Sequence, residues 1–156
     1  FLVFEMGDAK AILKKWALDF VKSRDAFFRK IAKIEDGSDN FTVFYKDGRE
    51  QPNLILPNLA EAIEALSSLD KSKPVAIVTL NNKTNRQKLE EIWKTAVEYR
   101  QLTIYVVNPF SDGEKKWVLM PHVHNKICDG NLATGFNSLS ELVEDISEEE
   151  ASSKAD

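Results

Sequence analysis

Hydrophobic residues recur every three or four positions through the first part of the chain. This spacing predicts one long amphipathic helix that begins at Asp8, whose side chain serves as the N-cap, and continues to about Ile34. The apolar positions that would form its buried face are Ile12, Leu13, Trp16, Ala17, Phe20, Phe27 and Ile31. The fold is therefore expected to begin with a helix that has one buried face, with a break near Ser23-Arg24-Asp25 as the alternative.

Alternating apolar and polar residues come next. Residues 41–46 and 49–56 have the period of two that is typical of half-buried strands, and Asp47-Gly48 between them is a favoured sequence for a tight hairpin turn. Pro52 lies in the second of these strands. Because proline has no N–H to donate to a neighbouring strand, its position indicates an edge strand or a bulge.

The middle of the chain predicts a strand–helix–strand unit. Residues 75–80 and 102–107 are nearly all apolar, as expected of central strands that are covered on both faces, and an amphipathic helix spans about 84–100 between them. A right-handed crossover would make the two strands parallel neighbours. A shorter amphipathic helix, residues 60–69, precedes this unit.

The C-terminal third has weaker patterns. Residues 116–120 are expected to pair antiparallel with the preceding strand, and residues 121–135 lack a periodic pattern. Ser138 and Glu141 have the spacing of a capping box, which predicts a last helix. Its buried residues would be Leu142, Val143 and Ile146. From Glu148 onward the acidic composition is typical of a disordered tail.

These elements predict one α/β domain over residues 1–147, followed by an acidic disordered tail over residues 148–156. Its mixed sheet would carry the long N-terminal helix, the hairpin, the crossover unit and a C-terminal helix. No stretch approaches the ~20 apolar residues of a membrane span. The single cysteine, Cys128, fits a reducing compartment, so a cytoplasmic protein is expected. Met6-Gly7-Asp8 has the form of a natural start.

Asparagines follow the two central strands. Ligands of open α/β sheets gather at the carboxyl ends of parallel strands, which marks Asn81, Asn82, Lys83 and Asn108 as the default binding site. This group contains one cation and no acid, so it does not indicate acid–base chemistry. A purely structural interpretation is also open, because asparagine caps helices well and a helix is predicted to begin here.

The order of helix, hairpin, strand, helix and strand resembles the core of the PD-(D/E)XK nuclease superfamily, which includes restriction enzymes and archaeal Holliday junction resolvases. In that family an Asp opens the second strand, often after a Pro, and an acid-x-Lys triplet closes the third. The matching positions in this chain are Pro52-Asn53 and Asn81-Asn82-Lys83. The resemblance covers roughly residues 8–110 and implies a restriction-endonuclease-like fold.

The chain departs from that family in two respects. Both acids are replaced by asparagine, and the predicted helix at residues 60–69 separates the hairpin from the next strand, where the family has a tighter connection. Mg²⁺ needs carboxylate charge, and two amides do not supply it. The resemblance therefore implies a relic site formed by Asn53, Asn81 and Lys83 with no catalytic activity.

One segment resembles a metal site. His122 and His124, in an extended segment, would face the same way, with Cys128 and Asp129 close behind as further ligands for zinc. The four-ligand Cys/His spacing of structural zinc is missing. A polar loop with hydrogen-bonded imidazoles is the alternative interpretation.

Charge is distributed unevenly in a chain whose net charge is −4. Residues 10–33 contain eight basic residues and two acids, whereas residues 141–156 contain seven acids and one lysine. The basic residues that would form a binding face are Lys14, Lys15, Lys22, Arg29 and Lys30. Three interpretations of these two segments are open: a nucleic-acid patch with an acidic tail, two regions that neutralise each other, or ordinary solvated surface.

The leading interpretation is a non-catalytic binding or regulatory domain on a nuclease-like core that needs no cofactor. Because the chain is acidic overall, a protein partner or self-association fits better than nucleic acid. Two alternatives remain. One is a metal-dependent nuclease or hydrolase that uses zinc or Mg²⁺ near His122 and His124, and the other is a nucleic-acid binder that acts through the basic N-terminal helix.

Overall fold

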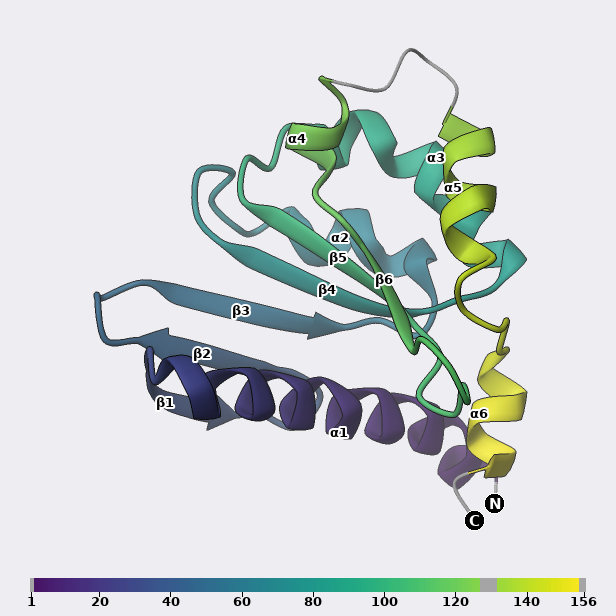
Figure 1. Cartoon of the computed structure of the whole chain (residues 1–156), viewed down its shortest axis with the longest axis horizontal. Helices are drawn as coiled ribbons and strands as arrows, with labels where there is room; N and C mark the ends of the chain where they lie inside the picture. Colours follow the sequence, from purple (N-terminus) through teal and green to yellow (C-terminus); the bar gives the residue numbers. More distant parts are fainter. Residues whose placement is uncertain (1, 127–131, 155–156) are drawn as a thin grey trace.

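A six-stranded mixed sheet forms the centre of the molecule, and its strands lie side by side in the order of the sequence (Figure 1). The structure is a computed structural model and describes residues 2–126 and 132–154. The strands are β1 (Ile31–Asp36), β2 (Phe41–Tyr45), β3 (Glu50–Ile55), β4 (Val75–Leu80), β5 (Leu102–Val107) and β6 (Lys116–Leu119). The first three form an antiparallel meander, β3, β4 and β5 are parallel, and β6 closes the sheet antiparallel to β5.

Helices cover both faces of this sheet. They are α1 (Leu2–Phe28), the 3₁₀ turn η1 (Leu59–Glu61), α2 (Ala62–Leu66), α3 (Lys83–Val97), α4 (Pro121–His124), α5 (Leu132–Ser140) and α6 (Glu148–Lys154). On one face α3 packs against side chains such as Ile77 and Ile104, and on the other α1 and α6 pack against Ala76 and Val78. Every residue of β4 is buried, because the strand lies between these two layers. The expected α/β domain with a mixed sheet is confirmed.

The N-terminal helix ends earlier than its apolar pattern predicts. It stops at Phe28, because Arg29 adopts a positive φ of 52° and the Asp25 carboxylate accepts the N–H groups of Lys30 (2.6 Å) and Ile31 (3.0 Å). The helix also begins at Leu2, so Asp8 is not its N-cap.

The strand β1 follows, where the pattern predicted more helix. A register shift between Ile31 and Lys33 inserts an extra residue into the pairing with β2. Ile31 and Ile34 therefore pack against the same core cluster although they are three positions apart. The bulged strand thus reproduces the three-residue spacing of a helix face, which explains the incorrect prediction.

The hairpin is confirmed, but β3 is a central strand instead of an edge strand. Gly48 provides the positive φ of 95° at its turn. The N–H of Ile55 donates to Asn40 on the side of β2, so alternation directs the nitrogen of Pro52 toward β4. The ladder with β4 begins only at Asn53, one residue later, and the missing N–H therefore interrupts no pairing.

The C-terminal segment differs most from expectation. The helix expected from Ser138 is absent, because α5 ends at Ser140 and residues 141–147 are not helical. Val143 and Ile146 are buried as predicted, whereas Leu142 is 62% exposed. Residues 148–154, expected as a disordered tail, form α6, which packs through the fully buried Ala151 against α1 (Figure 1).

Candidate functional site

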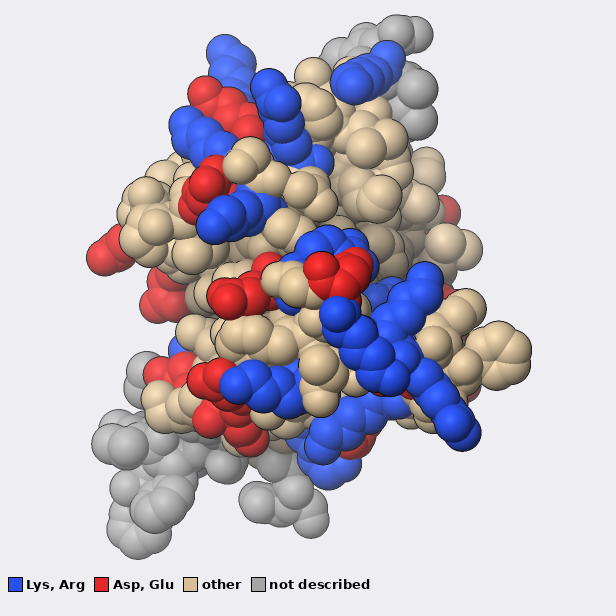
Figure 2. All heavy atoms as spheres, turned by 90° about the vertical axis from the view of Figure 1, so that its left-hand side faces the viewer, with Lys and Arg blue, Asp and Glu red and all other residues tan. Residues whose placement is uncertain are grey.

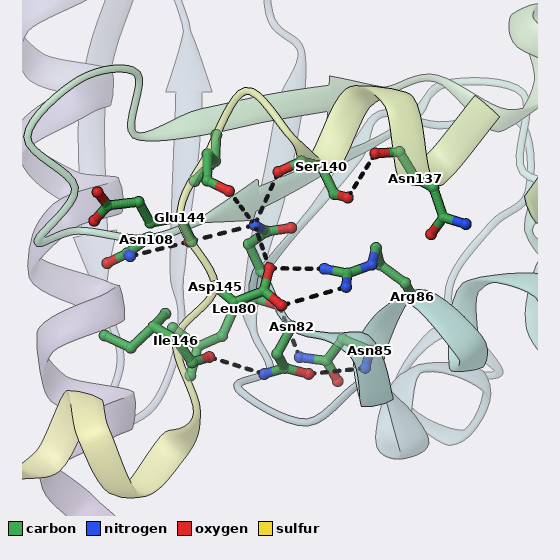
Figure 3. A network of polar contacts seen from close by, with 12 residues as sticks. Leu80, Asn82, Asn85, Arg86, Asn108, Asn137, Ser140, Glu144, Asp145 and Ile146 are labelled. Atoms are coloured by element: carbon green, nitrogen blue, oxygen red, sulfur yellow. Dashed lines mark hydrogen bonds and ion pairs between the residues drawn. The ribbon is translucent and has the colours of Figure 1, made fainter. Parts of the chain in front are cut away.

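The carboxyl ends of β4 and β5 are covered by the chain itself. Residues 141–147, which we call the C-terminal strap, run across this edge of the sheet (Figure 3). Asn82 donates its Nδ2 to the carbonyl of Ile146 at 3.0 Å, and Asn108 donates its Nδ2 to that of Glu144 at 3.0 Å. The position where an α/β sheet ordinarily binds its ligand is therefore filled from within the molecule.

Asn81 is the central residue of this contact and is fully buried. Its Nδ2 donates to the carbonyl oxygen of Val143 at 2.9 Å and lies 3.2 Å from Oδ1 of Asp145. Its Oδ1 accepts the indole N–H of Trp117 at 2.8 Å, and its backbone oxygen accepts the N–H of Ile146 at 2.8 Å. An asparagine is needed here, because its side chain must donate and accept at the same time.

An ion pair holds the outer side of the strap. Arg86 of α3 contacts both oxygens of Asp145, at 2.9 and 3.3 Å (Figure 3). The guanidinium is mostly buried, with 15% of its side chain exposed, whereas 54% of the aspartate is exposed. Two donors in a fork geometry fix the direction of the carboxylate as well as its position.

Asn82 and the neighbouring Asn85 also anchor the start of α3 at this edge. Asn82 caps the helix by accepting the N–H of Asn85 at 2.9 Å, as the structural interpretation of this segment requires. Asn85 is buried, accepts the N–H of Leu59 at 3.0 Å and donates to the carbonyl oxygens of Pro57 and Leu80. The sequence did not single out Asn85, Arg86 or Asp145, because their partners come from distant parts of the chain.

The structure does not bring the three residues of the suggested relic site together. Asn53 pairs with Ala76, and Asn81 lies five residues further along β4, about 16 Å away at the ordinary rise of a strand. Asn53 is buried and donates to the carbonyl oxygen of Gln51 at 3.0 Å. Lys83 is exposed at the first position of α3. These residues could not bind one metal ion together.

The two histidines lie on a short helix instead of an extended segment. Positions two apart on a helix do not face each other, so His122 and His124 point in different directions. One ring nitrogen of His122 lies 3.0 Å from the carbonyl oxygen of Val97, and Nδ1 of His124 accepts the N–H of Met120 at 3.1 Å. Both imidazoles are therefore used as structural hydrogen-bonding groups.

A metal site at these histidines gains no support from the side chains around them. Within residues 2–126 and 132–154, no three His, Cys, Asp or Glu side chains are grouped as metal ligands. Cys128 and Asp129, the other expected ligands, lie outside the described residues.

The basic face expected on the N-terminal helix divides into two parts. Lys14 bonds to the carboxylate of Asp36 and to the carbonyl oxygen of Gly37, and Lys15 pairs with Asp19 at 2.8 Å. The remaining three predicted residues, with two neighbours, have no carboxylate within ion-pair distance among the described residues. These five cations are Lys22, Arg24, Arg29, Lys30 and Lys46, and all are exposed.

These five cations and Arg49 surround two adjoining pockets, and we call this region the basic end. The first pocket, of about 350 Å³, is lined by Lys22, Arg29 and Lys46. The second, of about 390 Å³, is lined by Arg24, Lys30 and Arg49. Figure 2 shows Lys and Arg gathered on one side of the lower half of this face of the molecule.

Only one acid, Asp25, lines the two pockets, and its carboxylate is engaged by two backbone N–H groups. Both N–H groups donate to Oδ1, and the carboxylate keeps its negative charge, which offsets one of the six surrounding cations. Arg49 is paired with Asp47 at 2.8 Å, and the N–H of Arg49 is the main cause that lowers the pKa of that aspartate. The basic end consequently keeps most of its positive charge.

Two phenylalanines protrude beside these cations. Phe27 is 85% exposed and Phe28 is 58% exposed, with their rings edge to face at 5.3 Å. The Lys30 ammonium lies 5.6 Å from the centre of the Phe28 ring. Large exposed apolar side chains next to unpaired cations are typical of a contact surface.

None of the described helices is both long enough and apolar enough to cross a membrane. Comparison of this chain with protein-family models, curated proteins and solved structures gave no significant match.

Proposed function

We propose that this chain is a non-catalytic binding domain on a degenerate nuclease-like core, and that a negatively charged partner binds at its basic end. The observation that carries the proposal is the cluster of five exposed cations without ion-pair partners among the described residues. Other exposed cations, such as Lys83 and Lys94, also have no ion-pair partner among the described residues, so the distinguishing feature of the basic end is that its cations surround two adjoining pockets.

The strand order supports a nuclease-like core. A long helix, three antiparallel strands and a parallel crossover follow one another in a single sheet. With β1 counted as the first strand, the third strand would be β3, which ends in Asn53-Leu54-Ile55. That triplet contains neither the acid nor the lysine of the family's motif. The triplet Asn81-Asn82-Lys83 contains the lysine but not the acid. Under both alignments the metal-binding carboxylates are missing.

The sheet edge supports a non-catalytic role. A bound metal or substrate at the carboxyl ends of β4 and β5 would have to displace the strap and its bonds to Asn81, Asn82 and Asn108. These amides already have partners, so they are not free to act on a ligand.

Helix electrostatics explain only part of the basic end. Arg29 directly follows the last turn of α1, so the helix dipole accounts for that cation without a partner, whereas Arg24 lies before the last turn, which contains no basic residue. Lys46 and Arg49 come from the β2–β3 hairpin and are outside that effect. Two separate elements therefore direct positive charge to one place, and a negatively charged partner would be attracted there.

The experiment compares two triple variants that lose the same charge. One carries Lys22→Gln, Arg29→Gln and Lys46→Gln at the basic end. The other carries Lys15→Gln, Lys71→Gln and Lys88→Gln, which lie outside it. We expect wild type and the second variant to be retained on heparin and polyglutamate surfaces, and the first variant to elute at lower salt. Equal elution of the two variants, or no retention of wild type, would refute the proposal.

The enzymatic alternative is tested on the same preparations. Titration with Mg²⁺, Mn²⁺ or Zn²⁺ and incubation with branched and linear DNA should give neither metal binding nor cleavage. Cleavage that disappears in His122→Ala would replace the proposal with the metal-dependent enzyme.

A further inference from the structure

We propose that the basic end binds an acidic segment of a partner protein that inserts apolar side chains into the two pockets. This inference rests on the proposed function and adds the chemistry of the partner. It follows from the floors of the pockets, which are apolar although their rims are cationic.

The first pocket has an aliphatic floor. Its half-buried lining consists of Ile31 and Ile34 of β1 with Asp25 of α1, and its exposed lining consists of Ala26, Lys22, Arg29 and Lys46. Ile31 and Ile34 are half-buried, and the bulge in β1 directs both toward α1. A volume of about 350 Å³ is sufficient for one aliphatic side chain with room for its backbone.

The second pocket adjoins the first and shares Ile31 and Asp25 with it. Its half-buried lining contains the apolar side chains of Val21, Ile31 and Tyr45 together with Asp25 and Gln51, and the exposed Phe28 ring lies at its side. Its rim cations are Arg24, Lys30 and Arg49. The same arrangement of an apolar floor and three cations therefore occurs twice, side by side.

A partner has to satisfy the rims and the floors at once. Carboxylates would pair with the cations, and apolar side chains would remove the isoleucines and Phe28 from water. A segment in which acidic and apolar residues are interspersed provides both groups at short spacing. A purely acidic chain would leave the floors in contact with water and would bind only by charge.

Nucleic acid matches this surface less well. The chain has a net charge of −4 although the basic end is positive, so the rest of the chain has a negative net charge and would repel a long polyanion that extends beyond the basic end. Bases stack on flat aromatic faces; the first pocket has none, whereas Phe28 and Tyr45 line the second, so an oligothymidylate probe tests the nucleic-acid alternative directly. A short acidic segment ends where the positive charge ends.

The backbone at Arg29 gives independent support. Its φ of 52° lies in the left-handed region, which glycine and asparagine adopt more easily than arginine. Arginine at this position puts a cation at the rim of the first pocket, on the turn that joins α1 to β1. A left-handed residue directly after the last helical residue is a common way for a helix to end, so this conformation supports the position of the cation.

The test measures the binding of three labelled probes of equal length by fluorescence anisotropy. They are a peptide of repeated Glu-Glu-Leu, a peptide of repeated Glu-Glu-Ser and an oligothymidylate. We expect the leucine peptide to bind about tenfold more tightly than the serine peptide, because one inserted leucine supplies that factor. Phe28→Ala should reduce this preference, and Ile63→Ala, a change at a partly exposed residue of α2, should not.

Each other outcome overturns the inference in a distinct way. Equal binding of the two peptides would mean attraction by charge alone, and the proposed function would stand without the apolar insertion. Tighter binding of oligothymidylate would identify a nucleic-acid surface. If none of the probes binds and the wild-type protein is also not retained on heparin, the proposed function fails together with the inference. Both variants should unfold in urea at the wild-type midpoint, since Phe28 and Ile63 are 58% and 45% exposed.

Discussion

The strongest test of the strap is the substitution Asn81→Asp, which changes one amide into a carboxyl group of nearly the same shape. Asn81 is fully buried, and its Nδ2 faces only acceptors, namely the carbonyl oxygens of Ser140, Val143 and Glu144 and a carboxylate oxygen of Asp145. An aspartate oxygen at this point would be repelled by all of them. One carboxylate oxygen would keep the indole N–H of Trp117 as its donor, but the other would face only acceptors, so the residue would either stay charged at a high cost or take up a proton.

The expected loss can be estimated from the bonds involved. The bond to Val143, at 2.9 Å, contributes about 1 kcal/mol, and the contact with Asp145, at 3.2 Å, roughly 1.5–3 kcal/mol because one partner is charged. These two contributions sum to about 2.5–4 kcal/mol, and the buried charge places the expected loss at the upper end of this range, about 4 kcal/mol, at pH 7. Domains of this size have a free energy of unfolding of roughly 5–15 kcal/mol, so the variant should still fold.

The loss should depend on pH in a defined direction. Burial next to acceptors raises the pKa of the new carboxyl in the folded state above its unfolded value. A raised folded pKa means that stability is lost as the pH rises, by up to about 1.4 kcal/mol per pH unit. Urea unfolding at pH 5 and pH 7.5 should therefore show a smaller deficit relative to wild type at pH 5.

A matched control uses the same chemical change at an exposed cap. Asn58→Asp keeps the oxygen that accepts the N–H of Ala60 at 2.9 Å, so stability should change by less than about 0.5 kcal/mol. A deficit below about 1 kcal/mol for Asn81→Asp would refute the conclusion that the hydrogen bonds of the Asn81 amide hold the strap. Recovery of stability with Mg²⁺ would instead indicate a metal site that an acid restores, as a degenerate nuclease implies.

Two further predictions concern the two ends of α1. Arg29→Gly should raise the free energy of unfolding by up to about 1 kcal/mol, because glycine adopts the positive φ without strain, and it should weaken binding to polyglutamate. A loss of stability as large as that caused by Lys30→Gly would contradict this prediction. Ala151→Glu should detach α6 from α1 and cost roughly 2–4 kcal/mol, with early proteolysis of the C-terminus, because this position is fully buried. Ser153→Glu, at an exposed position of the same helix, is its control, and equal stability of the two variants would mean that α6 does not dock.

The sequence by itself determined the elements whose signals are local. The apolar run of β4, the Asp47-Gly48 turn and the cap at Asn82 each depend on neighbouring residues only, and each was predicted correctly. Periodicity and turn chemistry specify such elements wherever they lie in the fold.

Tertiary structure decided the features that depend on distant partners. Ile31 and Ile34 fit a helix by spacing, and only pairing with β2 and the capping role of Asp25 made them part of a strand. The helix predicted from the capping box at Ser138 does not form, because the side-chain amides of residues 81, 82 and 108 bind carbonyl oxygens of the strap that a helix would have used.

The same reason applies to the candidate sites. The sequence correctly identified the asparagines at the sheet edge as a group, but it could not show that residues 141–147 lie over them. It placed Lys14 and Lys22 on one basic face, and only the fold paired the first with Asp36 while leaving the second unpaired beside β1. A side chain is free for binding only when no other part of the chain has reached it first, and that depends on contacts between residues far apart in the sequence.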